Sequence, residues 1–545
     1  MKIAHYLIPI FSFLLASCGF KSKDADLVIY NASSISTMDP GNTLTQAIAI
    51  KDGKIVALGK EREILNQYNA TQTLDAKKGF IYPGFHDAHC HFLGFATNLY
   101  RVDLKGTRSA EEVIGRLKAF AKVNPEATWI TGRGYDQTLW KKGEPHKAIL
   151  DTHFRTTPIV IQRIDGHAVW GNSKALELAG ISAKTKIEGG LINLDDNGTT
   201  GIVLEMAGDH LLSFVPPLTT EQKEKALMRA QDLCFAAGLT YMTDAGLPWA
   251  DILILDSLAK VGKIKIGLNV MVQNQPDDIQ ELVKTGGINQ PNFRVQSIKV
   301  YGDGSLGSRS ACLKEHYADK HDHFGITVIQ PDSLKKIADI AYANNLQLNI
   351  HSIGDSTSAM VLGVFGEVLQ SNNDKRWRIE HAQVLDPKDH QKIIDLRIIP
   401  SVQPTHATSD RRWAIDRVGA DKKDRLYAYK SLLKLNGILP FGTDFPVEEI
   451  HPLSTFQSAV FRRSDTLQAP FLPEEGLDAK TALLGMTVFP AIASFLEDSI
   501  GSIAVGKYGD IVILNRKLET LQEGDFNALE IRTTVKRGEI VYSKQ

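Results

Sequence analysis

The nine residues Pro83-Gly84-Phe85-His86-Asp87-Ala88-His89-Cys90-His91 decide the fold, because they join a short apolar strand to two closely spaced histidines. Side chains two residues apart in a strand point to the same side, so His89 and His91 converge while Cys90 points away from them. Two imidazoles that converge at the end of a strand form half of a metal site. The pattern His-x-His also occurs by chance, so the rest of the chain has to supply the other half.

Short apolar runs recur along the middle of the chain and alternate with helical stretches, which is typical of a parallel α/β fold. The candidate strands end at Asp87, Asp244, Val272, Tyr301, His351, His381, Val402 and Asp444. Eight such strands predict a closed (β/α)8 TIM barrel, in which the functional groups lie at the carboxyl ends of the strands.

Metal-ligating residue types gather at these predicted strand ends. The candidate ligands are His89, His91, Lys299, His351, His381 and Asp444. Imidazole nitrogens and carboxylate oxygens suit a borderline ion such as zinc, although such a set accepts several divalent ions. We therefore predict one or two divalent metal ions, with Zn2+ as the best match, at the mouth of the barrel.

Strand-like runs near both ends of the chain predict a second, smaller β domain. Residues 26–31 and 47–58 alternate in the same way as residues 509–514 and 538–542,. We expect a small β-sandwich formed by residues 19–82 and 486–545, with the barrel at residues 83–485. A long insertion, about residues 98–236, follows the first barrel strand.

The insertion and the barrel loops supply candidates for substrate binding. The insertion holds an aromatic and polar cluster with His167 and Trp170, and insertions after barrel strands often shape the pocket,. Arg309 and Gln403 are polar residues near predicted strand ends of the barrel. The alternative for all four is structural: packing for His167 and Trp170, and hydrogen bonds to loop carbonyls for Arg309 and Gln403.

The first 18 residues have the pattern of a targeting segment. Lys2 precedes a short apolar stretch, Tyr6 to Leu15, which is too short for a comfortable membrane span,. The stretch ends in Leu15-Ala16-Ser17-Cys18-Gly19, which resembles a bacterial lipoprotein signal with a lipidated cysteine. We predict a signal peptide at residues 1–18 and an exported protein, tethered through Cys18 to the bacterial cell envelope (periplasmic or outer membrane) by lipid alone. The alternative is an ordinary secretory signal with a chance cysteine.

Charge and glycine patterns argue against nucleotides and nucleic acids as ligands. The formal net charge is −1, and the chain has no basic stripe,. The run Gly302-Asp303-Gly304-Ser305-Leu306-Gly307 matches the G-x-G-x-x-G pattern of dinucleotide sites. Such a site also needs a βαβ unit, and Asp303 would repel phosphates. We interpret the run as a glycine-rich loop of the active site and predict no cofactor besides metal.

Taken together, the motifs resemble those of the amidohydrolase superfamily, in particular metal-dependent amidohydrolase family 3, over nearly the whole mature chain. They are PGFHDAHCH at 83–91, DGHAVWGNSKAL at 165–176, KVYGDGSLGSR at 299–309, HSIGD at 351–355, RIEHAQ at 378–383, PSVQPTH at 400–406, GTDFPV at 442–447 and GSIAVGKYGDIVIL at 501–514. The chain departs from the family at Gly509, where alanine is usual, and this position belongs to the predicted sandwich.

The resemblance implies that the four histidines of the candidate set are metal ligands. His89 and His91 would bind one ion. His351 and His381 would bind a second ion or orient the substrate. The number of ions, one or two, stays open.

The resemblance also implies roles for Lys299 and Asp444. Lys299 would be carboxylated on its amine and would bridge two ions, because a free ammonium group cannot bind a cation. Its alternatives are a structural ion pair and a substrate-binding cation. Asp444 would be both a ligand and the general base that takes a proton from water and delivers it to the leaving amine. Its alternative is a helix N-cap just before Pro446.

The implied activity is metal-dependent hydrolysis of a carbon–nitrogen bond other than a peptide bond. The expected small-molecule substrate is an N-formyl or N-acyl amine or an N-acyl amino acid. Two alternatives stay open: hydrolysis of a cyclic amide, a lactone or another ester at the same site, and a catalytically silent surface lipoprotein that binds a small molecule or a metal. The sequence does not fix the oligomeric state, and a homo-oligomer is compatible with it.

Overall fold

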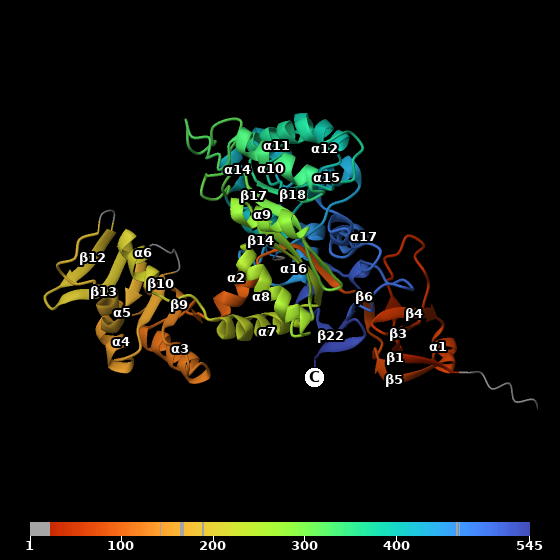
Figure 1. Ribbon diagram of the computed structural model, residues 1–545, viewed down its shortest axis with the longest axis horizontal. Coiled ribbons are helices and arrows are strands. Elements are labelled where there is room, and N and C mark those ends of the chain that lie inside the picture. The colour runs from red at the N-terminus through yellow and green to blue at the C-terminus, as the bar shows by residue number, and fades with distance from the viewer. Residues whose placement is uncertain are drawn as a thin grey trace, which may run out of the picture.

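Four β-sheets organise the chain into a central barrel, an insertion and two sheets near the termini (Figure 1). The structure is a computed structural model that describes residues 22–141, 143–163, 168–187, 190–464, 467 and 469–544. The insertion and the terminal sheets lie on opposite sides of the barrel. Within these described ranges, no helix combines the length and the hydropathy that a membrane span requires.

The largest sheet is parallel, and it curves into the predicted barrel. Its neighbouring strands are, in order, β7 (Phe85–Cys90), β14 (Leu239–Leu247), β15 (Gly267–Gln273), β17 (Phe293–Tyr301), β18 (Gln347–Ser352), β19 (Arg378–His381) and β20 (Ile399–Ser401). A short strand, β16 (Ile288–Gln290), pairs antiparallel with β17. The strands are buried almost throughout, as expected for a parallel sheet that is covered on both faces,.

The eighth position of the barrel is filled by residues 440–445, which form single backbone contacts instead of a full strand. On one side, Val402 pairs with Phe441 as an isolated parallel bridge. On the other side, the Ala88 N–H donates to the Phe441 carbonyl at 2.9 Å, and the Asp444 N–H donates to the His89 carbonyl at 2.8 Å. The barrel prediction is therefore confirmed, with a nearly closed barrel.

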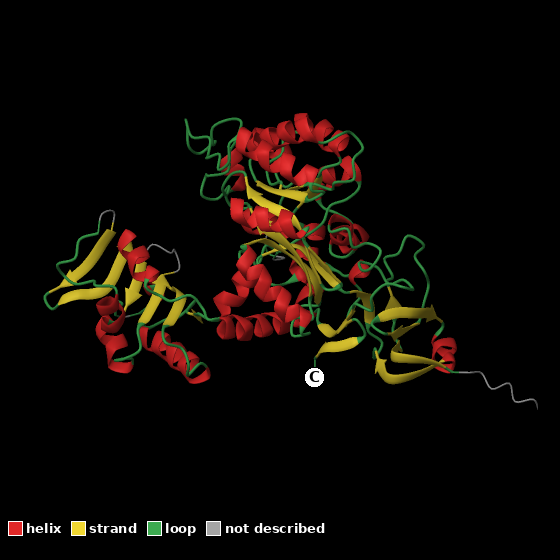
Figure 2. Ribbon diagram, in the orientation of Figure 1, coloured by secondary structure: helices red, strands yellow, loops and turns green. Residues whose placement is uncertain are grey.

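Helices surround the barrel strands (Figure 2). They are α2 (Phe92–Leu99), α7 (Thr220–Ala236), α8 (Trp249–Lys260), α9 (Pro276–Thr285), α10 (Pro331–Ala343), α11 (Asp355–Val368), α12 (His390–Leu396), α13 (Pro404–Asp410), α14 (Ala414–Val418), α15 (Tyr429–Asn436), α16 (Pro452–Phe461), α17 (Ala479–Gly485) and α18 (Val488–Ala493). The sequence marks their ends: Thr219 and Gln222 form a capping box at the start of α7, and Gly286 ends α9 with a φ of 70°,.

The insertion folds around cores of its own. Its mixed sheet has the order β12 (Gly190–Asp195), β13 (Gly198–Glu205), β11 (Ala168–Gly171), β10 (Ile159–Arg163), β9 (Ile130–Tyr135) and β8 (Val102–Asp103). Helices α3 (Ala110–Val123), α4 (Lys147–His153), α5 (Ser173–Leu178) and α6 (Met206–Ser213) pack on it around two apolar clusters. The last helix of the expected insertion, α7, instead contacts α2 and β14, so the separately folded part ends near Ser213.

Both termini build the predicted β-sandwich. One sheet contains β4 (Lys54–Gly59), β3 (Ala47–Lys51), β1 (Lys23–Tyr30) and β5 (Tyr68–Asp75), beside α1 (Glu61–Gln67). The other contains β2 (Ser34–Ile35), β6 (Phe80–Pro83), β21 (Ile511–Leu514), β22 (Ile531–Lys536) and β23 (Glu539–Ser543). Leu27, Ile50, Ile81 and Ile511 belong to the core that the two sheets share. A Cβ at Gly509 would lie 2.6 Å from Ile50 Cδ1, which explains glycine there.

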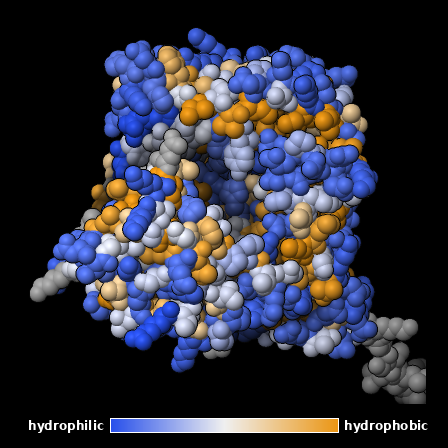
Figure 3. Space-filling model, turned by 60° about the vertical axis from the view of Figure 1, so that its left-hand side comes forward, coloured by the Kyte–Doolittle hydropathy of each residue, from blue (hydrophilic) through white to orange (hydrophobic). Residues whose placement is uncertain are grey.

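Figure 3 turns the molecule so that the insertion comes toward the viewer, and the surface on this face has a deep hollow. The inside of this hollow is hydrophilic, while apolar residues gather on parts of its rim. Small molecules bind in concave surfaces of this kind.

Closure of the barrel depends on glycine at position 442. A Cβ there would lie 2.6 Å from both the backbone nitrogen and the backbone oxygen of His89. We predict that Gly442→Ala lowers the free energy of unfolding by about 1–3 kcal/mol, because the strand has to move away from β7. Thermal and denaturant unfolding measure this change.

The matched control is Gly363→Ala in helix α11, where a Cβ would meet nothing within 4 Å. Alanine favours a helix interior over glycine by about 1 kcal/mol, so this variant should unfold at or above the wild-type temperature. Equal stability of Gly442→Ala and the wild type would contradict the close approach of the two segments.

Candidate metal centre

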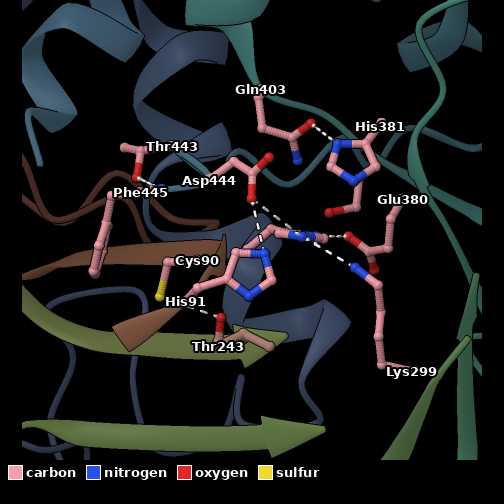
Figure 4. Close-up of polar contacts among 12 residues, drawn as sticks. Cys90, His91, Thr243, Lys299, Glu380, His381, Gln403, Thr443, Asp444 and Phe445 are labelled. Carbon is pink, nitrogen blue, oxygen red and sulfur yellow. Dashed lines mark hydrogen bonds and ion pairs between the residues drawn. The ribbon is translucent and has the colours of Figure 1, made fainter. Parts of the chain in front are cut away.

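The six candidate ligands lie at the carboxyl ends of the barrel strands. Figure 4 shows four of them, His91, Lys299, His381 and Asp444, close to one another. His89 lies in β7 and His91 directly follows it, while Lys299, His351 and His381 lie in β17, β18 and β19, and Asp444 in the eighth position. The ring centroid of His89 is 4.7 Å from that of His381, which in turn is 4.4 Å from that of His351. Strands that are far apart in the chain therefore present one cluster.

His89 is fully buried and is oriented by a buried carboxylate. Its Nδ1 lies 2.5 Å from Glu380 Oε2, and Arg378 binds the same carboxylate, with Nε 2.6 Å from Oε1. Burial would raise the pKa of Glu380, but Arg378 and His89 hold it below its ordinary value. An ionised Glu380 accepts the Nδ1 proton of His89, so the lone pair of Nε2 is left for a metal ion.

Asp444 faces both imidazoles of the His-x-His pair. Its Oδ1 lies 3.2 Å from His91 Nε2 and 3.6 Å from His89 Nε2, and it lacks a hydrogen-bond partner of good geometry within the described part of the chain. Ligand atoms about 2.0–2.1 Å from a tetrahedral ion lie roughly 3.3–3.4 Å from one another. The spacing of these three atoms therefore fits a shared metal ion.

His381 and His351 line the same cavity with different partners. His381 Nδ1 lies 2.8 Å from Gln403 Oε1, so the amide carbonyl fixes the proton on Nδ1 and leaves the lone pair on Nε2,. His351 Nε2 lies 3.2 Å from the carbonyl oxygen of Gly304. Burial lowers the pKa of His351 to about 3 and that of His89 to about 4, so both are neutral near pH 7, as metal ligands must be,.

Lys299 is buried beside the histidines. Its Nζ lies 3.2 Å from His89 Nε2, and only 1% of the residue is exposed. Burial lowers the pKa of Lys299 to about 8. The amine is therefore held in an environment that disfavours its charged form.

Two groups of three residues could hold a metal ion, and Asp444 belongs to both. One group is His89, His91 and Asp444, and the other is His381, His406 and Asp444, with the ligand atoms of each within 4.8 Å of one another. The donor chemistry of the first group, two imidazoles and a carboxylate, is that of zinc sites. The residues present therefore fit the predicted metal.

A cavity of about 340 Å3 opens above these side chains. It is lined by His91, Lys299, Tyr301, Ser305, Leu306, Gly307, His351, Ile353, His381, Gln383, His406, Asp410, Trp413, Asp444, Val447 and Glu448. The size is in the range of sites for small molecules.

Of the four predicted substrate-binding residues, none of the three that the structure describes lines this cavity. Trp170 is fully buried in the insertion, where its ring packs 5.7 Å from that of Tyr135. Arg309 pairs with Asp319, with Nη2 2.9 Å from Oδ2, and does not line the cavity. Gln403 hydrogen-bonds His381, which lines the cavity, but does not line the cavity itself. His167 lies outside the described residues, as does Cys18.

Several polar residues of the site escaped the sequence-based prediction. His406 lines the cavity, Glu380 and Arg378 orient His89, and Gln383 contacts His406. All four lie within the motifs RIEHAQ and PSVQPTH. A metal-ligating histidine needs a second residue that hydrogen-bonds its other ring nitrogen. Polar residues close to the predicted ligands in these motifs were therefore the signal for such partners.

The glycine-rich run after β17 forms a loop, and the next helix, α10, begins only at Pro331. The carboxylate of Asp303 accepts backbone N–H groups from Cys312, Ile353 and Gly354 at 2.8–3.0 Å. The loop is thus tied to the end of β18, and its carboxylate is occupied. This geometry supports the interpretation as an active-site loop and not as a dinucleotide site.

Comparison with known proteins places the chain in a family. The family profile described as "Amidohydrolase family" matches residues 72–542. The chain belongs to the amidohydrolase family. The sequence-based recognition of the family is thereby confirmed, together with its coarser consequence, a hydrolase with clusters of metal-ligating side chains.

Relatives and solved structures of this amidohydrolase match over almost its full length. It is 30% identical to the putative amidohydrolase YtcJ of Bacillus subtilis, over 95% of this chain and 99% of the relative. It is 25% identical to the N-substituted formamide deformylase of Arthrobacter pascens, over 95% of this chain and 98% of that protein. Among solved structures, an uncharacterized metal-dependent hydrolase from Pyrococcus horikoshii has a TM-score of 0.76 and 27% identity, and covers 91% of this chain and 99% of its own.

The buried carboxylate of Glu380 gives a test of the metal centre. Glu380→Gln keeps the side-chain shape but removes the charge that fixes the His89 tautomer, so we predict an affinity for Zn2+ about 10- to 100-fold weaker than in the wild type. Competition with a chromophoric chelator measures the affinity. His89→Ala, which removes the ligand itself, should abolish tight binding.

The control is Glu497→Gln, which removes the charge of a carboxylate that binds Arg376. Neither residue lines the cavity. This variant should bind Zn2+ as the wild type does. Full metal occupancy in His89→Ala would exclude His89 as a ligand.

Proposed function

We propose that this protein is an exported, metal-dependent amidohydrolase that cleaves the amide bond of an N-formyl or N-acyl amine, a carbon–nitrogen bond other than a peptide bond. The observation that carries the proposal is the spacing of 3.2 and 3.6 Å between Asp444 Oδ1 and the Nε2 atoms of His91 and His89. This spacing occurs at the barrel mouth, beside a cavity that admits a small molecule.

A divalent ion bound by His89, His91 and Asp444 would lower the pKa of a water ligand to about 7 and polarise the scissile carbonyl. Burial would raise the pKa of Asp444, but the imidazoles of His91 and His89 hold it below its ordinary value. The carboxylate is therefore ionised near neutral pH. Asp444 takes the proton of the attacking water as its oxygen bonds to the carbonyl carbon, and delivers it to the nitrogen as the carbon–nitrogen bond breaks.

Carboxylation of Lys299 is part of the proposal. The lowered pKa of about 8 provides a fraction of neutral amine near pH 7. The Nζ of this form bonds to the carbon of CO2 and loses a proton, which gives a carbamate anion in place of an ammonium group. Because Lys299 Nζ lies 3.2 Å from His89 Nε2, a carbamate on this nitrogen would lie beside His89 and could share a cation with it. It would also suit a second ion bound by His351 and His381.

The charges of the cavity wall favour neutral or cationic amines over N-acyl amino acids. Apart from Lys299 and the metal-ligating groups, the charged side chains among the described lining residues are Asp410 and Glu448. Both would repel the carboxylate of an N-acyl amino acid. Trp413 and Val447 add apolar surface beside them. The similarity to an N-substituted formamide deformylase supports the same substrate class.

Amine release tests this function. We predict that the chain without residues 1–18, loaded with Zn2+, releases amine from N-formyl or N-acyl amines and prefers neutral or cationic amine parts over N-acyl amino acids. Asp444→Asn should lower kcat by about 10²- to 10⁴-fold, because it removes the general base. Glu448→Gln should lower the ratio of kcat/KM between these amines and N-acyl amino acids by about twofold to fivefold, because it removes one negative charge at the cavity wall.

Hydrolysis of the same panel by Asp444→Asn at the wild-type rate would refute the role of Asp444. If the wild type cleaves none of the N-formyl and N-acyl compounds but hydrolyses lactones or cyclic amides, the alternative substrate class replaces the proposed one. Preference for N-acyl amino acids would contradict the argument from the cavity wall.

The proposal of export rests on the sequence of the first 18 residues. The segment ends in Leu15-Ala16-Ser17-Cys18, the pattern that resembles a lipoprotein signal. A lipid on Cys18 would tether the enzyme to the cell envelope and expose its barrel to extracytoplasmic amides.

Cell fractionation checks the anchor. In a bacterial host, the wild-type chain should sediment with membranes, and Cys18→Ser should lose this association, since no acyl chain can be attached. Cys312→Ser is the matched control, because Cys312 lies in the barrel loop after β17 and is not part of the signal. Membrane association of Cys18→Ser at the wild-type level would count against lipidation.

A further inference from the structure

His406 faces the cavity from the first turn of helix α13 with an unused nitrogen. The residue is 7% exposed, and its ring lies nearly parallel to that of His381, with the centroids 6.1 Å apart. Its Nε2 is buried and has no hydrogen-bond partner among the described residues. The nearest carboxylate oxygen, Asp444 Oδ2, is 3.7 Å away, which is too far for a hydrogen bond,.

A buried unpaired nitrogen beside Asp444 has two chemical explanations. Its Nε2 binds a metal ion through a lone pair, or it carries a proton and donates it to a ligand in the cavity. The tautomer of His406 distinguishes the two explanations, and the partner of the other ring nitrogen determines the tautomer.

The partner of His406 Nδ1 is an amide nitrogen. Gln383 Nε2 lies 3.2 Å from Nδ1, and the other end of the same amide, Oε1, lies 3.3 Å from the hydroxyl of Tyr427. The Tyr427 hydroxyl donates to this Oε1 and also to Asp410 at 2.7 Å, which fixes the orientation of the Gln383 amide, and the Tyr427 backbone N–H donates to the Gln383 carbonyl at 2.8 Å. An amide NH2 group only donates, so Nδ1 of His406 accepts and its proton lies on Nε2.

The neighbouring histidines have the opposite arrangement. Nδ1 of His89 faces a carboxylate oxygen at 2.5 Å, and Nδ1 of His381 faces an amide oxygen at 2.8 Å. Both therefore carry their proton on Nδ1 and offer Nε2 as a ligand. The chain thus gives His406 a different task from that of the two ligands beside it.

We propose that His406 is a catalytic residue that donates its Nε2–H to the carbonyl oxygen of the substrate, and that it is not a metal ligand. The donation strengthens as the attacking oxygen bonds to the carbonyl carbon and the carbonyl oxygen becomes an oxyanion. No bond to His406 forms or breaks, and its proton stays on Nε2 throughout. The inference rests on the proposed hydrolysis of an amide.

Removal of one buried donor to an oxyanion lowers kcat by about 10²- to 10³-fold. Because the ground-state carbonyl is a weaker acceptor than the oxyanion, the loss falls on kcat while KM changes little. His406→Met should show this pattern. His406→Gln keeps an N–H donor near the same place and should retain more of the activity than His406→Met.

The experiment compares three variants of the chain without residues 1–18: His406→Met, His406→Gln and His381→Met. Bound zinc is measured by elemental analysis after dialysis, and kcat and KM are measured with the preferred amide. Both His406 variants should keep the wild-type zinc content, whereas His381→Met should lose zinc, because His381 offers Nε2 as a ligand. Zinc loss in the His406 variants would make His406 a ligand and overturn the proposal.

A second measurement separates this inference from the proposed activity. Methylphosphonate has negatively charged oxygens on a tetrahedral phosphorus, so it resembles the tetrahedral intermediate of hydrolysis. Calorimetry measures its affinity for the zinc-loaded protein without turnover. His406→Met should bind it at least about tenfold more weakly than the wild type, and His406→Gln should lie between the two. If the wild type cleaves no amide, the proposed function fails while this affinity still tests the donor. Equal affinity in the wild type and His406→Met would refute it.

Discussion

Closure of the barrel between residues 85–91 and residues 440–445 is the constraint on which the site depends. The carboxylate of Asp87 holds the two segments together, since it accepts the Thr443 hydroxyl at 2.6 Å, the Thr443 N–H at 3.1 Å and the His89 N–H at 3.0 Å. Gly442 allows the backbones to approach. Only through this closure does Asp444 lie within 3.2–3.6 Å of two imidazoles that precede it by more than 350 residues.

A second constraint acts on the imidazoles themselves. Each buried ring near the cavity has one nitrogen bound to a partner that fixes its proton: Glu380 for His89, Gln403 for His381 and Gln383 for His406. Burial alone would leave the tautomers free to exchange. The partners leave a lone pair on Nε2 of His89 and His381 and a proton on Nε2 of His406. We propose that the first two nitrogens bind a cation and that the third donates a hydrogen bond to the substrate.

The sequence predicted those parts of the fold that depend on local pattern. Alternating strands and helices gave the barrel, and strand-end positions gave the six clustered residues, because side-chain direction in a strand follows from spacing alone. His406 could not be found in this way, since it follows Pro404 in a helix and reaches the cavity only through the placement of α13. Trp170 was predicted as a substrate-binding residue because it belongs to the aromatic and polar cluster of the insertion, but packing within the insertion buries it.

We propose above all that His89, His91 and Asp444 hold a divalent ion at the mouth of the barrel. A crystal of the zinc-loaded protein, measured above and below the zinc absorption edge, tests it directly. We predict an anomalous peak about 2.0–2.2 Å from the Nε2 atoms of His89 and His91 and from a carboxylate oxygen of Asp444, and no peak coordinated by His406. If the protein binds zinc tightly but shows its peak away from these three residues, they do not form the metal site.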